Sequence, residues 1–426
     1  MGVIRVPKPF HIAYLAQHYL PESGALPARV SEMARYWLSS GARVTVITAI
    51  PHRPEGRIRK EYVGRLFTDS TENGVRVMRS WVYARPSHSS LSTLINNLSF
   101  ACMSAVQALR GRVNADVLIA SEPPFFPHVS GVMLGRRWRI PVVLEIRDLW
   151  PDYVAEMNLI PKVAQRWLFS LERSVLLRAA HVVTVTESFR RRVIEKGVAG
   201  DRTTVVSNGV DAEFYRPIQE PSHPVVTTVP GERIVGYVGN FGRGQGLEQV
   251  VAAAARLERE RSDVRFILVG DGPTREQIRS FAASAGVQRF TIADPISKET
   301  TRQFYNSCDV VLVPLAPLRV FEDTVPSKLF EILACGRPLV ASVAGEAARI
   351  VRESGAGVVV RPGDADALAG AISQTLAVLP NELALRGALG REFVMREFSR
   401  DAQAGRYLEL LQQVATASDA RWRSRR

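Results

Sequence analysis

The sequence is poor in the residues that build metal centres and disulfide frameworks. It contains 3 cysteines, Cys102, Cys308 and Cys335, and 7 histidines among 426 residues. The cysteines are far apart and lack metal-ligand spacing, which excludes a disulfide-stapled secreted domain and a zinc module. We therefore expect a protein of a reducing compartment with no metal site.

Long apolar runs and repeats are lacking as well. No stretch approaches the roughly 20 consecutive apolar residues that cross a bilayer, and the opening MGVIRVPKPFHIAYL lacks the layout of a secretory leader. The absence of a short-period repeat argues against solenoids and propellers. These absences predict a globular cytoplasmic protein without a membrane span.

Positive charge, by contrast, is abundant. The chain has 55 Lys and Arg against 42 Asp and Glu, a formal net charge of +13. Such a surplus favours a polyanionic partner: nucleic acid, an anionic membrane surface or a phosphorylated ligand. Basic clusters with aromatic residues occur at 136–139, 189–192 and 421–426, and each is equally compatible with a solvated basic face.

Apolar β-branched runs alternate with segments of helical periodicity along the chain. RVTVITAI and PVVLEI have the composition of strands buried on both faces of a parallel sheet. A proline-rich polar stretch from 217 to 230 interrupts the alternation, which resumes at RIVGYVGNF. We expect two doubly wound α/β domains, over residues 1–215 and 216–399, and a helix over about 400–426 able to pack back on the first.

A glycine-rich turn, GNFGRGQGLE, precedes a helix of the second domain. Its glycines allow the backbone to approach a phosphate, the helix N-terminus supplies N–H donors, and Arg243 adds a cation. Leu247 stands where a dinucleotide fingerprint needs a third glycine, and no Walker lysine follows, which excludes those two nucleotide sites. Tight-turn packing without a ligand is the alternative.

The segment FEDTVPSKLFEILACG places an acid on a largely apolar helix. A helix beginning near Pro326 carries Lys328 in its first turn and Glu331 about one turn later, with Asp323 before its start. A carboxylate in apolar surroundings needs a hydroxyl or cationic partner. A sugar ring or a ribose supplies such hydroxyls.

The ordered motifs PESGALP, EIRDLWPDYV, VTVTESF, VVSNGVDAEFY, GNFGRGQGLE, VGDGP and PSKLFEILACG resemble the family-four retaining glycosyltransferases of the GT-B fold. The resemblance covers nearly the whole chain and is closest to the WbuB-like branch, assigned to bacterial surface polysaccharides such as lipopolysaccharide, O-antigen, exopolysaccharide and capsule. It implies two Rossmann-like domains facing a central cleft, with a nucleotide-diphosphate sugar, expected to be a UDP-sugar, on the C-terminal domain. It also implies a lipid-linked glycan acceptor, an amino-deoxy sugar such as N-acetylfucosamine as the transferred group, and neither a further cofactor nor a metal.

The resemblance also assigns roles to residues. On the donor side, Arg243 binds the diphosphate and Glu331 holds the ribose. Gln245 stands where the family has a lysine, and Lys328 takes over the role of that lysine. The full donor set is Gly242, Arg243, Gly244, Lys328, Leu329 and Glu331. Asp323 meets sugar hydroxyls, with Glu322 beside it. The catalytic candidates are Asp323, Arg147 and Asp148 at the family's His–Asp position, and His18, while Gly24 belongs to the acceptor loop.

Two alternatives stay open at this point. A sugar-nucleotide epimerase of the same fold would need no separate acceptor. A basic nucleic-acid-binding protein would need a helix-turn-helix, an aromatic stacking sheet or a zinc module, and none is found, so no nucleic-acid partner is expected.

A lipid-linked acceptor implies a peripheral position on the inner face of the cytoplasmic membrane. The predicted contact is an apolar stripe with basic neighbours: Leu91, Leu94, Ile95, Leu98, Cys102, Val106 and Leu109 with Arg110, Arg112, Arg136, Arg137, Trp138 and Arg139. The same helical spacing is equally typical of a core helix.

Overall fold

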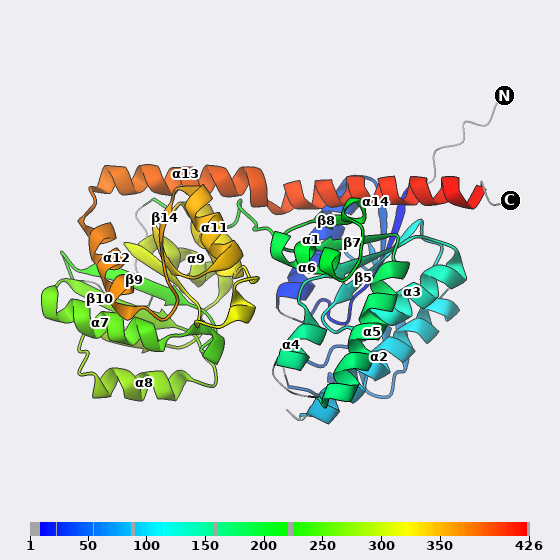
Figure 1. Ribbon diagram of the computed structural model, residues 1–426, viewed down its shortest axis with the longest axis horizontal. Helices are drawn as coiled ribbons and strands as arrows, with labels where there is room; N and C mark the ends of the chain where they lie inside the picture. Colours follow the sequence, from blue (N-terminus) through cyan, green and yellow to red (C-terminus); the bar gives the residue numbers. More distant parts are fainter. Residues whose placement is uncertain are drawn as a thin grey trace. The chain divides into compact units, whose positions relative to one another are not determined.

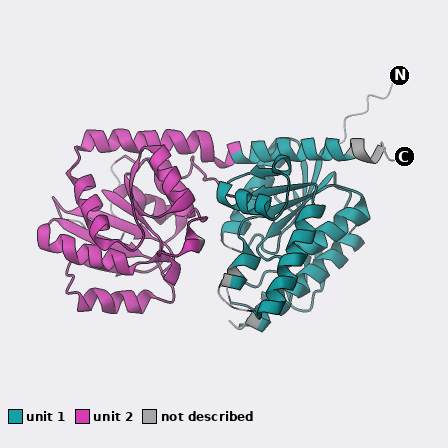
Figure 2. Cartoon of the chain, viewed as in Figure 1, with its two compact units in different colours: residues 1–207, 403–426 teal, residues 208–402 magenta. Residues whose placement is uncertain are grey.

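Two compact units make up the chain. The computed structural model describes residues 9–22, 24–53, 55–86, 90–111, 113–156, 160–219, 225–227 and 229–423 (Figure 1). The first unit comprises residues 1–207 and 403–426, and the second comprises residues 208–402 (Figure 2). Among the described residues no helix is both long and apolar enough to cross a membrane.

An eight-stranded sheet in the order β3-β4-β2-β1-β5-β6-β7-β8 forms the centre of the first unit. All its neighbouring strands pair in parallel except β3 and β4. The strands are β1 (His11–Leu15), β2 (Arg43–Ala49), β3 (Phe67–Glu72), β4 (Val75–Ser80), β5 (Val117–Glu122), β6 (Val142–Ile146), β7 (His181–Thr184) and β8 (Thr203–Val205).

Helices cover both faces of this sheet (Figure 1). They are α1 (Ala25–Ser39), α2 (Ser90–Arg110), α3 (Phe126–Trp138), α4 (Trp150–Glu156), α5 (Lys162–Arg178), α6 (Glu187–Glu195) and α14 (Arg400–Arg423), with short turns η1 (Lys60–Tyr62) and η2 (Gly200–Arg202). One apolar core lies under α2, α3, α5 and α6, and the other lies under α1 and α14. Apolar residues of these helices thus cover both sides of the central strands.

The antiparallel hairpin of β3 and β4 is absent from the sequence-based expectation. Strand β3 is mostly exposed and carries no apolar run, so hydrophobicity does not reveal it. Its turn contains Asn73 and Gly74 with φ of 49° and 82°. An Asn-Gly pair with both residues at positive φ is a strong hairpin signal and would have located it.

The second unit has a fully parallel six-stranded sheet in the order β11-β10-β9-β12-β13-β14. Its strands are β9 (Arg233–Val238), β10 (Val264–Val269), β11 (Phe290–Ala293), β12 (Val310–Pro314), β13 (Leu339–Ser342) and β14 (Gly357–Val360). Counted within the unit this is the order 3-2-1-4-5-6 of dinucleotide-binding domains, in which the strand order reverses between β9 and β12. Ligands of such sheets bind at that switch point, beyond the carboxyl ends of the strands.

Helices also cover both faces of the second sheet. They are α7 (Glu248–Glu260), α8 (Arg275–Ser284), α9 (Lys298–Ser307), α10 (Ser327–Ala334), α11 (Gly345–Ser354), α12 (Ala365–Ala377) and α13 (Pro380–Phe398), with turns η3 (Arg243–Gln245) and η4 (Arg319–Phe321). One core lies under α9, α10, α11 and α13, and the other lies under α7, α8 and α12. The predicted α/β class with two doubly wound sheets is confirmed.

The unit boundary lies at Ser207, upstream of the expected boundary at residue 215. Val210, Ala212 and Tyr215 are buried in the core of the second unit, and Val210 bridges to Ser399. Residues 210–215 therefore belong to the second unit. Of the prolines used to predict the linker, Pro221 and Pro224 lie outside the described residues.

Helix α14 contributes to the core of the first unit from residue 403 onward. Tyr407, Leu411 and Val414 are buried beside α1, and the Trp37 indole donates a hydrogen bond to the carbonyl of Ala404 at 2.9 Å. Residues 404–414 therefore complete a core that begins with β1.

Candidate functional site

Glycines at the end of β9 bring the backbone close to a lysine and to a neighbouring loop. Gly239 has φ of 154°, and a Cβ there would lie 2.5 Å from Nζ of Lys328. Gly246 is left-handed with φ of 56°, and a Cβ there would lie 3.0 Å from the backbone of Ala316. Side chains at these two positions would displace the lysine or the loop, so the glycines are required by geometry as well as by conformation.

Lys328 lies in the first turn of α10, and its amine reaches back to the glycine turn. Nζ donates to Oε1 of Gln245 at 3.0 Å and lies 4.1 Å from the ring centroid of Tyr237. Among the described residues no carboxylate forms an ion pair with it. Burial lowers its pKa to about 7, and Glu331 offsets part of that effect. A buried ammonium with a ring and an amide as its neighbours is a site prepared for an anion.

The hydroxyl of Tyr237 holds the amide of Gln245 and the turn in place. The Tyr237 hydroxyl donates to the carbonyl of Asn240 at 2.8 Å, and it also lies 3.2 Å from Oε1 of Gln245. Arg243 is exposed on η3, and no hydrogen bond or ion pair of its side chain occurs in the described part of the chain. The turn with Arg243 and the first turn of α10 with Lys328 therefore place a free guanidinium and a fixed amine in the same unit.

Glu331 lies one turn beyond Lys328 and accepts a hydrogen bond from the buried Tyr305 hydroxyl at 3.2 Å. Burial raises the pKa of its carboxyl, while the Tyr305 hydrogen bond and the charge of Arg400 lower it. Further hydroxyl donors would stabilise the charged form. The arrangement fits a carboxylate that receives ribose hydroxyls.

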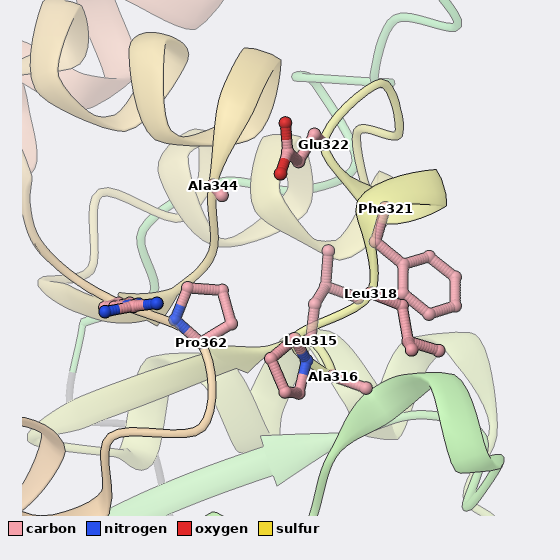
Figure 3. Close-up of a pocket in the computed structure, with 9 residues that line it drawn as sticks. Leu315, Ala316, Leu318, Phe321, Glu322, Ala344 and Pro362 are labelled. Atoms are coloured by element: carbon pink, nitrogen blue, oxygen red, sulfur yellow. The ribbon is translucent and has the colours of Figure 1, made fainter.

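The loop before α10 borders a cavity of about 150 Å³ in the second unit (Figure 3). Glu322, Phe321 and Arg361 are among its lining residues, and the loop adjoins the glycine turn because the Ala316 N–H donates to the carbonyl of Gly244 at 2.9 Å. Glu322 is exposed, and Asp323 follows it in the loop before α10. A ligand held by the turn can extend into this cavity.

Leu329 differs from the other donor candidates. Its side chain is 0% exposed in the core of the second unit, and its N–H donates to the carbonyl of Pro326 at 3.1 Å. No polar group of Leu329 is left for a nucleotide, because helix packing uses all of them. Its contribution is to hold α10, and thereby Lys328 and Glu331, against the sheet.

Arg147 and Asp148 follow β6 at the carboxyl edge of the first sheet. Nε of Arg147 is buried without a hydrogen-bond partner, whereas Asp148 is exposed. Neighbouring groups displace part of the hydration of Asp148 and raise its pKa, which the charge of Arg147 partly lowers. No ion pair within 4.0 Å joins the two side chains in the described part of the chain, and a hydrogen bond from the backbone of Leu149 also lowers the pKa of the Asp148 carboxyl.

His18 and Gly24 lie in the loop after β1, at the switch point of the first sheet between β1 and β5. Gly24 has φ of 128° and caps α1 at its N-terminus. His18 is buried, and its Nδ1 lies 2.7 Å from Oε2 of Glu22. The sequence did not indicate Glu22, although a separation of four residues is compatible with such a contact.

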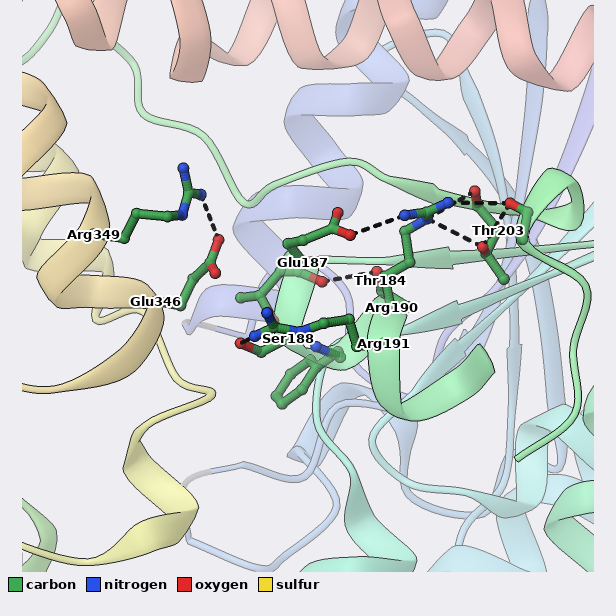
Figure 4. A network of polar contacts seen from close by, with 11 residues as sticks. Thr184, Glu187, Ser188, Arg190, Arg191, Thr203, Glu346 and Arg349 are labelled. Atoms are coloured by element: carbon green, nitrogen blue, oxygen red, sulfur yellow. Dashed lines mark hydrogen bonds and ion pairs between the residues drawn. The ribbon is translucent and has the colours of Figure 1, made fainter. Parts of the chain in front are cut away.

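The VTVTESF motif forms a capped helix start after β7 (Figure 4). The Thr186 hydroxyl accepts the N–H of Phe189 at 3.1 Å, and Arg190 pairs with Glu187 at 2.8 Å. In the second unit Arg349 pairs with Glu346 at 2.7 Å (Figure 4). These contacts satisfy the polar groups locally and indicate a structural role for the motif.

The second unit thus brings together Arg243, Lys328, Glu331 and the glycine turn, while Arg147, Asp148, His18 and Gly24 lie in the first. Sequence reasoning missed Tyr237, which contacts Gln245 and Lys328, and Tyr305, which donates to Glu331. The signal available was weak, since both look like ordinary apolar positions of a strand and a helix.

Two family models match the two units. One, "Glycosyl transferase 4-like domain", matches residues 24–209, and the other, "Glycosyl transferases group 1", matches residues 232–377. The chain belongs to the group 1 glycosyltransferases. This family membership confirms the resemblance found in the ordered motifs.

Curated relatives resemble this glycosyltransferase over most of its length. A putative colanic acid biosynthesis glycosyl transferase, WcaI of Escherichia coli, is 27% identical over 90% of this chain and 97% of its own. A 2-deoxystreptamine glucosyltransferase of Streptomyces kanamyceticus is 25% identical over 89% of this chain and 96% of its own.

Solved structures of glycosyltransferases share the fold. Sucrose-phosphate synthase of Thermosynechococcus elongatus superposes with a TM-score of 0.73 at 21% identity, over 96% of this chain and 100% of that one. HepE of Anabaena, solved with UDP and glucose, gives a TM-score of 0.65 at 19% identity, over 94% and 99%. The GT-B fold of this glycosyltransferase is therefore confirmed.

Proposed function

We propose that this glycosyltransferase moves a sugar from a nucleotide-diphosphate sugar, a UDP-sugar, to a lipid-linked glycan acceptor during bacterial surface-polysaccharide synthesis. The observation that carries the donor assignment is the buried Lys328 amine against the glycine turn, which lacks a carboxylate partner within the described residues. HepE, solved with UDP, and WcaI, named for colanic acid biosynthesis, support the donor class and the product class. The second unit is the donor domain, and the first is the acceptor domain.

The proposed reaction proceeds with retention and without a metal. The acceptor oxygen forms a bond to the anomeric carbon on the face from which the diphosphate departs, and a phosphate oxygen takes the acceptor proton. Lys328 and Arg243 stabilise the charge that grows on the leaving diphosphate. Glu331 holds the ribose, while Asp323 and Asp148 position the reacting sugar.

Calorimetric titration with UDP tests the donor assignment. We expect Arg243→Ala to weaken UDP binding about tenfold with an unchanged melting temperature, because one charged hydrogen bond to phosphate is lost. Arg259→Ala is the control, since Arg259 is an exposed arginine at the other end of α7. Equal UDP affinity of Arg243→Ala and wild type would refute the phosphate contact.

Label transfer tests the reaction itself. Radiolabelled UDP-, GDP- and TDP-sugars are incubated with the full chain and a bacterial lipid extract. Label in the lipid fraction supports the transferase, and interconversion of the nucleotide sugar without transfer would instead indicate the epimerase reading.

Helix α2 supplies the argument for the membrane. Its exposed stripe is apolar, with Leu91 65% and Leu109 49% exposed, while its buried face includes Asn97, Ser104 and Gln107. A helix of a soluble domain normally shows the reverse pattern. The exposed face therefore gains free energy when an apolar phase covers it.

Positive charge beside the stripe selects an anionic bilayer as that phase. Arg110 ends α2, and α3, which packs on α2, carries exposed Met133, Arg136 and Arg137. Trp138, expected at the surface, instead packs against the core, and Arg112 lies outside the described residues. Lysine and arginine near an anionic surface contribute about 1 kcal/mol each.

Sedimentation with phosphatidylglycerol vesicles tests this assignment. The variant Leu91→Ser/Leu94→Ser/Leu98→Ser should lose most vesicle binding, and high salt should weaken binding of the wild type. The matched control changes three exposed leucines of the second unit, Leu379→Ser/Leu385→Ser/Leu389→Ser, and should bind normally. Wild-type protein that stays in the supernatant at low salt would refute the membrane assignment.

A further inference from the structure

A buried cluster of polar side chains joins the first two β–α loops of the first unit. Glu22 is at its centre. Its Oε1 accepts the backbone N–H groups of His52 at 2.7 Å and Arg53 at 2.9 Å, and its Oε2 lies 2.7 Å from Nδ1 of His18. These donors hold the pKa of the Glu22 carboxyl at about 2 despite burial. An ionised carboxylate only accepts hydrogen bonds, so Nδ1 of His18 carries the proton of that imidazole.

The second histidine of the cluster is used up by its own partners. Nδ1 of His52 lies 3.0 Å from the carbonyl oxygen of Ile50, which can only accept, and its Nε2 lies 3.3 Å from the amide nitrogen of Asn96. Asn96 in turn donates to the carbonyl of Tyr83 and accepts from Gln17. His52 therefore braces the cluster and has no lone pair to offer.

Two acceptor atoms remain. No hydrogen bond reaches Nε2 of His18 from the described residues, and Oε1 of Gln17 is buried without a partner. Burial lowers the pKa of His18 to about 4, so the imidazole is neutral at physiological pH and its Nε2 keeps a lone pair. Both residues follow β1 at the switch point of the sheet, where open α/β sheets bind ligands. Gln17 thus offers a buried acceptor without a partner, and His18 offers an imidazole nitrogen without a partner among the described residues. Both call for a ligand that donates.

We infer that Nε2 of His18, oriented by Glu22, accepts a hydrogen bond from a hydroxyl of the sugar acceptor. The inference rests on the proposed transferase function and assigns a contact on its acceptor side. Glu22 acts as a positioning residue, because it fixes which imidazole nitrogen is free. This hydroxyl is not the attacking one: the contact orients the acceptor sugar, and the proton of the attacking hydroxyl passes to the departing phosphate.

A divalent cation is the competing occupant, since the ligand atoms of His18, Glu22 and His52 lie within 4.8 Å of one another. The hydrogen bonds argue against it. Both N–H donors to Glu22 Oε1 are backbone groups, and the proton on Nδ1 of His52 points at a carbonyl. A cation would have to displace these donors, whereas a hydroxyl at Nε2 of His18 displaces nothing.

The test uses the nucleotide sugar and lipid extract that give label transfer with the wild type. We expect His18→Phe to lower kcat/KM for the lipid acceptor by about tenfold or more, with UDP affinity and melting temperature unchanged. His18→Gln should recover part of the loss, because its amide oxygen can accept. Glu22→Gln should show a smaller loss than His18→Phe. The control is His181→Gln, which changes a histidine on β7 whose Nε2 contacts the Thr204 hydroxyl on β8. This variant should keep the wild-type kcat/KM.

Wild-type kinetics in His18→Phe, or a parallel loss of stability and transfer in every variant, would overturn the inference while leaving the transferase function intact. A stoichiometric metal in dialysed wild-type protein that His18→Phe loses would overturn it in favour of a cation. Absence of transfer by the wild type would count against the transferase function, and ¹⁵N NMR then still tests the cluster: a protonated Nε2 in His18 would refute the proposed tautomer.

Discussion

At the carboxyl edge of the first sheet, Glu22 and Glu145 are buried and already hydrogen bonded, whereas at that edge of the second sheet the half-buried Lys328 forms no ion pair with an acid among the described residues. Glu22 and Glu145 are 4% and 0% exposed and receive donors from backbone, histidine, arginine, tyrosine and serine groups. Among the described residues, Nζ of Lys328 donates to an amide oxygen and lies over an aromatic ring.

This difference separates two ways of preparing a binding site. The second edge is electrostatically incomplete, so an anionic ligand gains from neutralising it. At the first edge Glu22 and Glu145 already have their donors, and the lone pairs of Gln17 and His18 suit an uncharged hydroxyl. A transferase that binds a diphosphate on one domain and a glycan on the other needs both kinds of site.

The largest expected effect concerns the balance of the first edge. Nε and Nη2 of Arg29 donate to Oε1 of Glu145 at 3.0 Å each, and Nη1 donates to the carbonyl of Ser207 at 2.6 Å. Arg29→Met leaves the buried carboxylate unpaired, so we expect the first unit to lose about 3–5 kcal/mol of unfolding free energy. Urea unfolding measures this loss.

The matched control is Arg76→Met, which breaks an exposed pair with Asp69 on the same sheet and should cost less than about 1 kcal/mol. UDP affinity should survive Arg29→Met under native conditions, because the donor groups belong to the second unit. A loss in Arg29→Met no greater than in the control would show that the buried pair is not needed.

The next effect concerns Asp148. Asp148→Asn should reduce turnover about 100-fold with UDP affinity within about twofold of wild type, because the carboxylate acts on the reacting sugar rather than on the nucleotide. Steady-state label transfer and UDP titration measure the two quantities. Asp152→Asn serves for contrast, since Asp152 pairs with Lys196 at 2.5 Å and should affect melting rather than turnover. If Asp148→Asn lowers stability and activity together, Asp148 has a structural role.

The smallest effect is the pH dependence of donor binding. Burial lowers the pKa of Lys328 to about 7, and a bound diphosphate raises it, so binding takes up a proton above pH 7. UDP affinity should therefore fall by about tenfold as the pH rises from about 7 to 9 and then level off, because the loss is limited to the contribution of the charged lysine. The diphosphate itself is already largely ionised over this range.

Lys328→Met should bind UDP about tenfold more weakly at pH 7 and show a flat profile. Lys162→Met, which changes an exposed lysine of the first unit, should keep the wild-type slope. A wild-type slope in Lys328→Met would assign the proton to another group.

Buried runs and helix signals were sufficient to predict most of the two sheets. The periodicity of α2 identified its apolar stripe, but periodicity cannot tell which side of a helix faces the core, and the stripe proved to be exposed. The hairpin of β3 and β4 escaped because β3 has no buried run. For the site, the motifs located Arg243, Lys328 and Glu331. They did not locate Tyr237 and Tyr305, which contact Lys328 and Glu331, because these contacts join residues far apart in sequence.

The placement of α14 bears on how the protein is made. Tyr407 and Leu411 fill a core whose first strand begins at His11, so the first unit cannot complete its interior until residue 411 has left the ribosome. The second unit has no such dependence on the C-terminal residues beyond Ala402. During synthesis the second unit can fold first, while the nascent first unit still exposes the apolar surface of Trp37 that α14 later covers.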